Sequence, residues 1–216
     1  MQELMDLEKS FAILKRYSVP CAKWKIAKNA NSAARAAKNL GFPVAMKVSS
    51  KKIVHKSDVG GVKVNLADEQ EVISSFNEIV QNAKKKLHIR PEGVLVQKME
   101  TGTEVIVGLK RDPQFGPTVV FGLGGIFVEV LKDVSLRIAP LTKDDCLDMV
   151  KELKGYKILS GARGRKPVNI DAIVRILMAA SKIGMKNEHI MEMDLNPVMV
   201  NEKSANVVDV RIITEK

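Results

Sequence analysis

Apolar and polar residues alternate along the chain in patterns that predict a mixture of helices and strands. Over residues 4–17 an apolar residue recurs every three or four positions, which predicts an amphipathic helix. Residues 32–40 are rich in alanine and end at Gly41, as a helix followed by a C-terminal glycine does. Residues 43–48 form a compact apolar run between turn-forming residues, which predicts a buried strand.

The same patterns continue through the rest of the chain. Asp68 and Glu71 have the spacing of a capping box at the start of a helix, and Thr142 precedes another helical pattern, as do residues near 171–183. Because helices and strands mix without regular β-α-β alternation, we expect an α+β fold rather than a doubly wound sheet. The predicted strands are 21–27, 94–97, 104–109, 119–121, 127–130, 135–138, 190–200 and 205–212.

The 216 residues are enough for one large domain or two small lobes. We place the break near residues 99–102, with an N-terminal lobe over 1–100 and a C-terminal lobe over 101–216. Cys21 and Cys146 have neither CxxC nor zinc-site spacing, so we expect reduced, buried thiols.

Composition and charge narrow the class of protein. The acidic, amphipathic start MQELMDLEKS is neither a signal nor a transit peptide, and no apolar run approaches a membrane span, so we expect a cytoplasmic protein. The net charge of +10 is spread along the whole chain, and only six Phe, two Tyr and one Trp could stack on bases. We therefore expect neither nucleic acid nor membrane as a partner, although a positive surface attracts nucleotides and acyl phosphates.

Two residues near the predicted strand 43–48 could handle phosphate. Lys47 ends an apolar run, where a lysine is either a snorkelling edge residue or a phosphate ligand. His55 lies eight residues later, and a neutral imidazole can form a covalent phosphoryl intermediate near neutral pH. Asp58 could orient the ring, and Gly60 and Gly61 would let backbone N–H groups approach an anion. The alternative is an exposed loop histidine before a Gly-Gly turn.

Two further segments suit phosphate and metal chemistry. FGLGGI at 121–126 could cradle phosphate after a strand or form an ordinary turn, since it has neither the P-loop ending nor GxGxxG spacing. Asn196 and Asp209 could converge on Mg²⁺ if the strands at 190–200 and 205–212 are antiparallel neighbours, because Mg²⁺ prefers oxygen ligands. An Asn-Pro turn and an exposed strand aspartate are the alternative.

Read together, these segments resemble the β subunit of the ADP-forming acetyl-CoA synthetases, a branch of the ATP-grasp superfamily akin to succinyl-CoA synthetase. The blocks HKSDVGGV and DPQFGP…FGLGGI are highly specific to that family. The matching stretches, in family order from about residue 19 to 212, are GFPVAMKV, HKSDVGGVKVNL, LVQKM, GTEVIVGLKRDPQFGPTVVFGLGGIFVE, RIAPLT, GARG, DLNPVMV and VVDVRI.

The resemblance implies an ATP-grasp fold in which two α+β lobes clamp a nucleotide. Lys47 then touches the nucleotide phosphates, residues 97–99 meet the adenine at the hinge largely through backbone groups, and Glu104 lies near the ribose. The glycine pair at 124–125 lies beside the transferred phosphate. The implied nucleotide-binding residues are Lys47, Gln97, Lys98, Met99, Glu104, Gly124 and Gly125.

The resemblance also implies the chemistry. Asn196 and Asp209 match Mg²⁺ ligands, while Asp194 stands where related ligases often have Glu, so its part as a third ligand is left open. His55 matches the histidine that takes phosphate from a phosphohistidine on an α subunit and delivers it to ADP. The implied reaction is acyl-CoA + ADP + phosphate ⇌ acid + ATP + CoA.

No segment resembles the CoA-binding domain, so the resemblance implies a CoA-binding α subunit as partner, in a heterotetramer. Two other functions are alternatives: a non-catalytic nucleotide-sensing ATP-grasp module, and a carboxylate–amine ligase that uses a free acyl phosphate. The presence of His55, Lys47 and Asp209 disfavours the sensor, and the second chemistry needs no histidine carrier and usually a longer chain. Neither the acid substrate nor the choice between ADP and GDP follows from the sequence.

Overall fold

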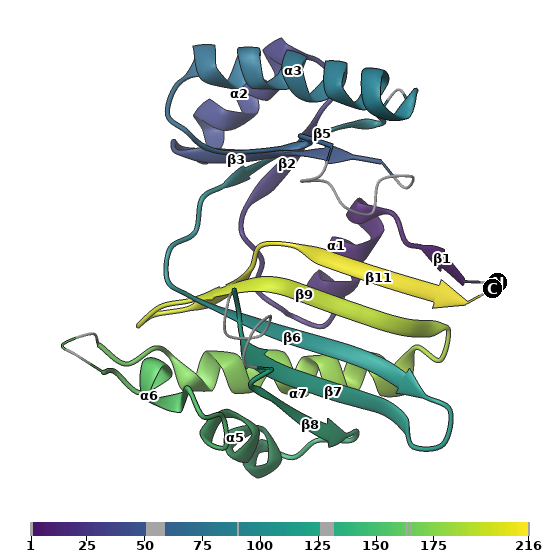
Figure 1. The fold of residues 1–216 in the computed structure, drawn as a ribbon, viewed down its shortest axis with the longest axis vertical. Helices are drawn as coiled ribbons and strands as arrows, with labels where there is room; N and C mark the ends of the chain where they lie inside the picture. Colours follow the sequence, from purple (N-terminus) through teal and green to yellow (C-terminus); the bar gives the residue numbers. More distant parts are fainter. Residues whose placement is uncertain are drawn as a thin grey trace. The chain divides into compact units, whose positions relative to one another are not determined.

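The chain divides into two compact units in the computed structural model, which describes residues 2–50, 59–89, 91–125, 132–162, 164 and 166–215. The smaller unit is Ala22–Met99, and the larger unit combines Met1–Cys21 with Glu100–Lys216. Helices and strands mix in both units, so the predicted α+β class is confirmed (Figure 1).

The smaller unit is a four-stranded antiparallel sheet with two helices on one face (Figure 1). The strand order is β2 (Trp24–Ala27), β5 (Gly93–Lys98), β3 (Val44–Ser49) and β4 (Val62–Leu66). The helices are α2 (Ala30–Leu40) and α3 (Glu69–Leu87).

Helix starts in this unit are fixed by side-chain caps. The Asn29 side chain accepts the Ser32 N–H at 2.8 Å, and the Asp68 side chain accepts the Glu71 N–H at 2.8 Å. Glu71 reaches past Asp68 and accepts the N–H of Ala67 at 2.7 Å, so the predicted capping box is displaced by one residue. Such caps contribute about 1 kcal/mol each.

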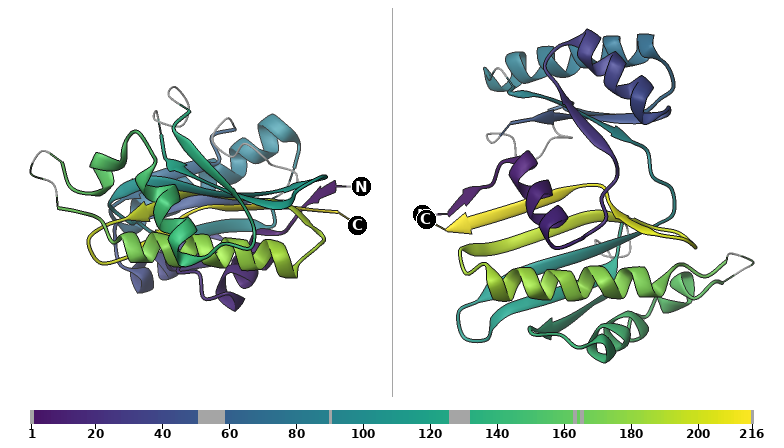
Figure 2. Two further views of the ribbon diagram at one scale, coloured as in Figure 1. Left: turned by 90° about the horizontal axis from the view of Figure 1, so that it is seen from below. Right: turned by 180° about the vertical axis from the view of Figure 1, so that it is seen from behind.

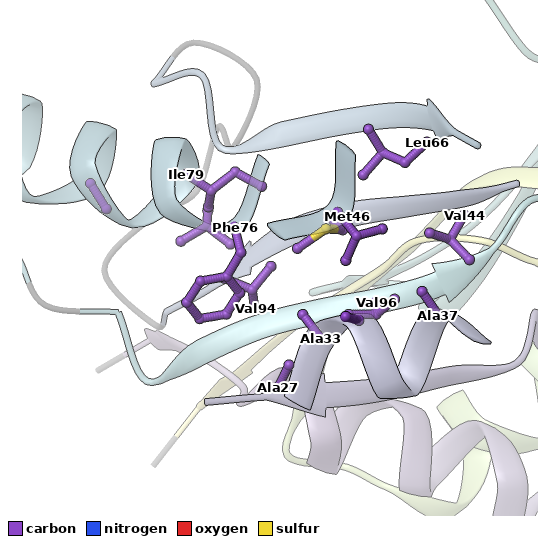
Figure 3. Packing of buried hydrophobic residues seen from close by; sticks show 14 residues of the cluster. Ala27, Ala33, Ala37, Val44, Met46, Leu66, Phe76, Ile79, Val94 and Val96 are labelled. Atoms are coloured by element: carbon purple, nitrogen blue, oxygen red, sulfur yellow. The ribbon is translucent and has the colours of Figure 1, made fainter. Parts of the chain in front are cut away.

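The core of the smaller unit lies between the sheet and its helices (Figure 3). Met46, Val94 and Val96 point from the strands toward Phe76 and Ile79 of α3. Burial of an apolar side chain of this size contributes about 1.5–3 kcal/mol. Because side chains alternate along a strand, the residues between these face away from the helices, and they include Lys47, Leu95 and Gln97.

The larger unit is built on a seven-stranded antiparallel sheet. Helices α1 (Leu7–Arg16) and α7 (Ile170–Lys186) cover one face of it (Figure 2), and α5 (Lys143–Lys151) and α6 (Tyr156–Leu159) connect β8 to α7. The other face, here called the polar face, carries Glu104, Asp194, Asn196 and Arg211, each of which is next to a buried residue on its strand. The strands are β1 (Gln2–Leu4), β11 (Val210–Glu215), β9 (Ile190–Val200), β6 (Thr103–Asp112), β7 (Gly116–Leu123) and β8 (Val134–Ile138), with β10 (Ala205–Val207) paired to β9.

The lobe boundaries differ from the prediction at the N-terminus. The boundary between Met99 and Glu100 falls within the predicted break, but residues 1–21, assigned above to the N-terminal lobe, belong to the larger unit. β1 pairs with β11 at Leu4↔Ile213. The backbone of Cys21 forms an isolated parallel β-bridge with Val207. Pairing to a distant C-terminal strand leaves no local signal in the sequence, which is why this part of the prediction was wrong.

Most predicted elements are present, with small shifts at their ends. The strand predicted over 205–212 is two strands, β10 and β11, separated at residues 208–209, and β1, β4 and α6 were not predicted. The strand predicted over 127–130 lies outside the described residues. Among the helices that the structure describes, none has the length and apolar character to cross a membrane.

Candidate functional site

Asn196 and Asp209 lie directly beside each other in the larger unit. β9 and β11 are antiparallel neighbours, as the metal-site prediction required, and the Asn196 N–H donates to the Asp209 carbonyl oxygen at 3.2 Å. The Val210 N–H donates to Asp209 Oδ1 at 3.0 Å, which orients the carboxylate. The strand pairing therefore places a residue with an amide oxygen next to a residue with a carboxylate, and Mg²⁺ accepts both kinds of oxygen ligand.

Asp194 belongs to the same polar face. It is two residues before Asn196 on β9, and it pairs in register with Arg211 of β11. Partial burial raises the pKa of the Asp194 carboxyl above its ordinary value. The positive charge of Arg211 lowers this pKa, whereas the negative charges of Asp209 and Glu192 raise it further. Arg211 also lies 3.8 Å from the Glu192 carboxylate. A carboxyl group with a raised pKa among other acids is one that gains from a nearby cation.

Arg211 is a residue that the sequence analysis did not single out. The buried residues Val210 and Ile212 flank it, so alternation along β11 places it on the polar face with Asp194. A signal was present in the sequence, because Arg211 stands between the apolar residues Val210 and Ile212, and alternation along a strand then turns it away from the core.

Glu104 and the glycine pair form a second group on the larger unit. The Gly124 N–H donates to the Glu104 carbonyl at 2.8 Å, and a Cβ at position 124 would lie only 2.8 Å from Glu104 Cβ. Gly125 has φ +62°, and a Cβ there would lie 3.7 Å from Glu104 Oε2. The residue expected near the ribose and the glycines expected near the phosphate are thus immediate neighbours.

Lys47 is buried in β3 of the smaller unit, on the face opposite α2 and α3. It is 7% exposed and pairs in register with Leu95 of β5 and Val62 of β4. Snorkelling at an edge requires an exposed ammonium group, so burial disfavours that alternative. Proteins keep a buried ammonium group where it meets an anion, and a nucleotide phosphate is such an anion.

The hinge residues 97–99 differ in their surroundings. The Lys98 N–H donates to the Lys23 carbonyl at 2.9 Å, and the Met99 N–H donates to the Pro43 carbonyl at 3.2 Å. The Lys98 side chain is exposed, and that of Gln97 is fully buried on the same face as Lys47.

His55 and Asp58 lie outside the described residues, so the geometry of the predicted carrier segment is not part of this structure. Gly60, at its end, has φ +66° and accepts an N–H of the Asn82 side chain at 3.3 Å through its carbonyl. No cluster of three or more His, Cys, Asp or Glu side chains suited to a metal occurs within the described ranges. A cation at Asn196 and Asp209 would therefore need ligands beyond these two side chains.

Comparison with known proteins shows matches along nearly the whole chain. The ATP-grasp domain family matches residues 1–214. The β subunit of acetate–CoA ligase (ADP-forming) I from Pyrococcus furiosus is 48% identical over 206 residues, which cover 93% of this chain and 88% of that protein.

Solved structures agree with these sequence matches. Acetyl-coenzyme A synthetase 1 (dinucleotide forming) from Ca. Korarchaeum cryptofilum, in complex with coenzyme A and Ca-AMPCP, has a TM-score of 0.95 at 47% identity, covering 99% of this chain and 94% of that chain. A second structure of that enzyme, with coenzyme A and Mg-AMPPCP, has a phosphohistidine segment pointing towards the nucleotide-binding site. It has a TM-score of 0.86 at 44% identity, covering 99% of this chain and 93% of that chain.

Proposed function

Because the chain belongs to the ATP-grasp domain family, as its motifs predicted, we propose that it is the nucleotide-binding β subunit of an ADP-forming acyl-CoA synthetase. The observation that carries the proposal is the meeting of Asn196 and Asp209 on neighbouring strands, in a chain that is 48% identical to such a subunit. The residue roles follow the resemblance: Lys47, Gln97, Lys98, Met99, Glu104, Gly124 and Gly125 bind nucleotide, and His55 carries phosphate.

The step on this chain is transfer of a phosphoryl group between His55 and ADP. The phosphorus–nitrogen bond breaks, the imidazole nitrogen keeps the electron pair, and a terminal oxygen of ADP forms the new bond to phosphorus. Lys47 holds the phosphate oxygens by its charge, and the glycine pair lets backbone approach them. The transfer can run in both directions because phosphohistidine and ATP both hold a phosphoryl group that is readily transferred.

The residues present fit a magnesium ion. Asn196 and Asp209 would hold it through two hard oxygen donors, and nucleotide phosphates and water would complete its shell. When bound, Mg²⁺ neutralises charge on the phosphate oxygens. The chain's own contribution is to fix the amide and the carboxylate beside each other through the strand pairing.

The remaining steps belong to a CoA-binding α subunit, with which this chain forms an α₂β₂ heterotetramer in the cytoplasm. The Pyrococcus relative is named as one subunit of its enzyme, which supports a partner. Both cysteines are free thiols, which is compatible with a reducing compartment; Cys146 is buried as predicted, whereas Cys21 is only partly buried.

The test is to follow phosphate in the complex coexpressed with its α subunit. Given acyl-CoA and labelled phosphate, this chain should acquire acid-labile, base-stable label, and His55→Ala should abolish ATP formation while sparing phosphorylation of the partner. His55→Asp is the second variant, since it is polar but cannot carry phosphate stably. In the Korarchaeum relative a phosphohistidine segment points towards the nucleotide site. If such a segment delivers phosphate directly, both variants will form ATP at the wild-type rate, and the relay through His55 is wrong.

A further inference from the structure

Strand β8 exposes a row of apolar side chains. Val134, Leu136 and Ile138 are 36%, 53% and 50% exposed, whereas Ser135 and its alternate neighbours turn to the other face. The described residues include only six exposed large hydrophobic side chains, and three of them stand in this one short strand. Single exposed apolar residues are ordinary on a protein surface, but a contiguous group marks an interaction site.

The row continues onto the neighbouring strands. Leu136 pairs in register with Val120 of β7, and directly paired residues share a face of the sheet. A Cβ on Gly122 would lie 3.0 Å from Val134 Cγ1 and 3.4 Å from Ile106 Cγ1, so these two side chains flank the glycine. The apolar side chains of this group are here called the β8 surface, and they are Ile106, Val120, Val134, Leu136 and Ile138.

The β8 surface is continuous with the polar face. Val120 pairs with Gly108 of β6, and Gly108 pairs with Asp194 of β9, so one line across four strands joins Leu136 to Asp194. With neighbouring strands about 4.8 Å apart, this line is about 14 Å long. A partner seated on the β8 surface therefore reaches the part of the polar face that is proposed to hold Mg²⁺ and phosphate.

The outer edge of β8 disfavours a second copy of this chain as the partner. The Ala139 N–H donates to the Pro117 carbonyl of β7, so alternation turns the N–H and the carbonyl of Leu136 to the outer edge. Arg137 donates to that carbonyl at 2.8 Å and also to the Glu152 carboxylate. A charged side chain at an edge discourages pairing with another strand, and two copies with a net charge of +10 repel each other.

We propose that the CoA-binding α subunit docks on the β8 surface through apolar side chains of its own, with acidic residues beside Lys110. The inference rests on the proposed function, in which phosphate passes from the α subunit to a nucleotide site that includes the polar face. Subunits that stay associated bury apolar surface. The Lys110 side chain is 72% exposed and lies 3.8 Å from the Glu192 carboxylate, and the net charge of +10 also suits an acidic partner.

The experiment measures binding of the purified α subunit to the full chain and its variants by calorimetry. Leu136→Glu should weaken association at least about tenfold, because it places a charge within an apolar contact. Leu136→Met stays apolar and should bind as tightly as the wild type. The matched control is Met185→Glu, at a residue of α7 that is 46% exposed and lies outside the β8 surface, and it should also bind as the wild type does.

Leu136→Glu should melt near the wild-type temperature and bind Mg-ADP as the wild type does, because the side chain is already half exposed. Ile138→Glu should show the same loss of association, and it keeps the test open if Leu136→Glu does not fold. Wild-type affinity for the α subunit in the glutamate variants of β8 would contradict the proposal, and so would an equal loss in Met185→Glu.

The isolated chain supplies one further outcome by analytical ultracentrifugation. A wild-type dimer that Leu136→Glu converts to a monomer would assign the β8 surface to a second copy, and the proposal would be wrong. Failure of the wild-type chain to bind any CoA-binding subunit would instead contradict the proposed function itself.

Discussion

The backbone of Asn196 holds the backbone of Asp209 through an N–H···O=C bond of 3.2 Å, so the separation of their side chains is set by strand pairing rather than by the side chains themselves. Replacing either side chain leaves that bond in place. The pair can therefore be tested for a metal role without disturbing β9 and β11.

Asp209→Asn should impair phosphoryl transfer far more than folding. In the wild type the Val210 N–H donates to Asp209 Oδ1 at 3.0 Å, and the amide of the variant keeps an oxygen that can accept this bond. The substitution removes the negative charge that attracts Mg²⁺. Activity of the assembled enzyme should fall at least about tenfold, or roughly 1.4 kcal/mol of barrier, with nearly coincident thermal melts. Glu202→Gln, at an exposed residue, is the control. An unchanged rate at saturating Mg²⁺ would remove Asp209 from the metal site.

Lys47→Met should weaken Mg-ADP binding by about tenfold or more, equivalent to roughly 1.4 kcal/mol, because it deletes a buried cation and keeps the length of the side chain. Lys25→Met is the matched control on an exposed position of β2, where no loss of affinity is expected. Calorimetry on the three proteins measures the difference. Equal affinities for all three would mean that Lys47 serves the fold and not the nucleotide.

Periodicity along the sequence predicted elements that are local. The alanine-rich helix before Gly41 and the helix capped by Thr142 were both recognisable, because caps and apolar spacing lie within a few residues of one another. The placement of residues 1–21 was not recognisable, because β1 pairs with β11 nearly 210 residues away, as Leu4↔Ile213 shows. The short alternating strand β4 was overlooked beside its Gly-Gly segment.

The candidate site, like the fold, had some features that the sequence predicted and others that depend on how the chain packs. Motif resemblance supplied Lys47, Asn196 and Asp209, and the structure adds that the last two are hydrogen-bonded neighbours. It also adds what no motif states, namely that the Gln97 amide is buried without a partner in the described ranges and that Arg211 shares a face with Asp194. Burial and register depend on the packed chain, so the sequence pattern alone could not rank these residues.

Stability should depend on pH through Glu152. Arg137 approaches it at 2.6 Å and, together with the Ser135 hydroxyl, lowers the pKa of the Glu152 carboxyl below its ordinary 4.5. A lowered folded-state pKa stabilises the protein above about pH 4.5, and this contribution is lost as the pH falls through the folded value. The side chains of Arg137 and Glu152 are 35% and 42% exposed. Water therefore screens their attraction, and the ion pair contributes less than about 1 kcal/mol to stability.

Arg137→Met should therefore lower the melting temperature at pH 7 by no more than about 2–4 °C, and the difference from wild type should shrink toward pH 3. Lys166→Met, which removes a more exposed ion pair with Glu202, is the comparison and should change the melting temperature less. Calorimetric melts between pH 3 and pH 7 test this. A difference that stays constant over that range would show that Arg137 acts by packing and not by charge.

Gly125 and Gly116 form a matched pair that separates backbone strain from function. Both have a left-handed backbone conformation, with φ +62° at Gly125 and φ +77° at Gly116. A Cβ at Gly125 would lie 3.7 Å from Glu104 Oε2, and a Cβ at Gly116 would meet nothing within 4 Å. Alanine should cost each position about 1–2 kcal/mol of stability through the same conformational penalty. Gly125→Ala adds a methyl group beside Glu104, at the point where the backbone of the glycine pair is proposed to approach the phosphate. This variant alone should therefore weaken Mg-ADP binding, by about tenfold. Chemical denaturation and calorimetry measure the two effects separately. Equal losses of affinity in both variants would trace the effect to strain, and the glycine pair would then have no place in the phosphate site.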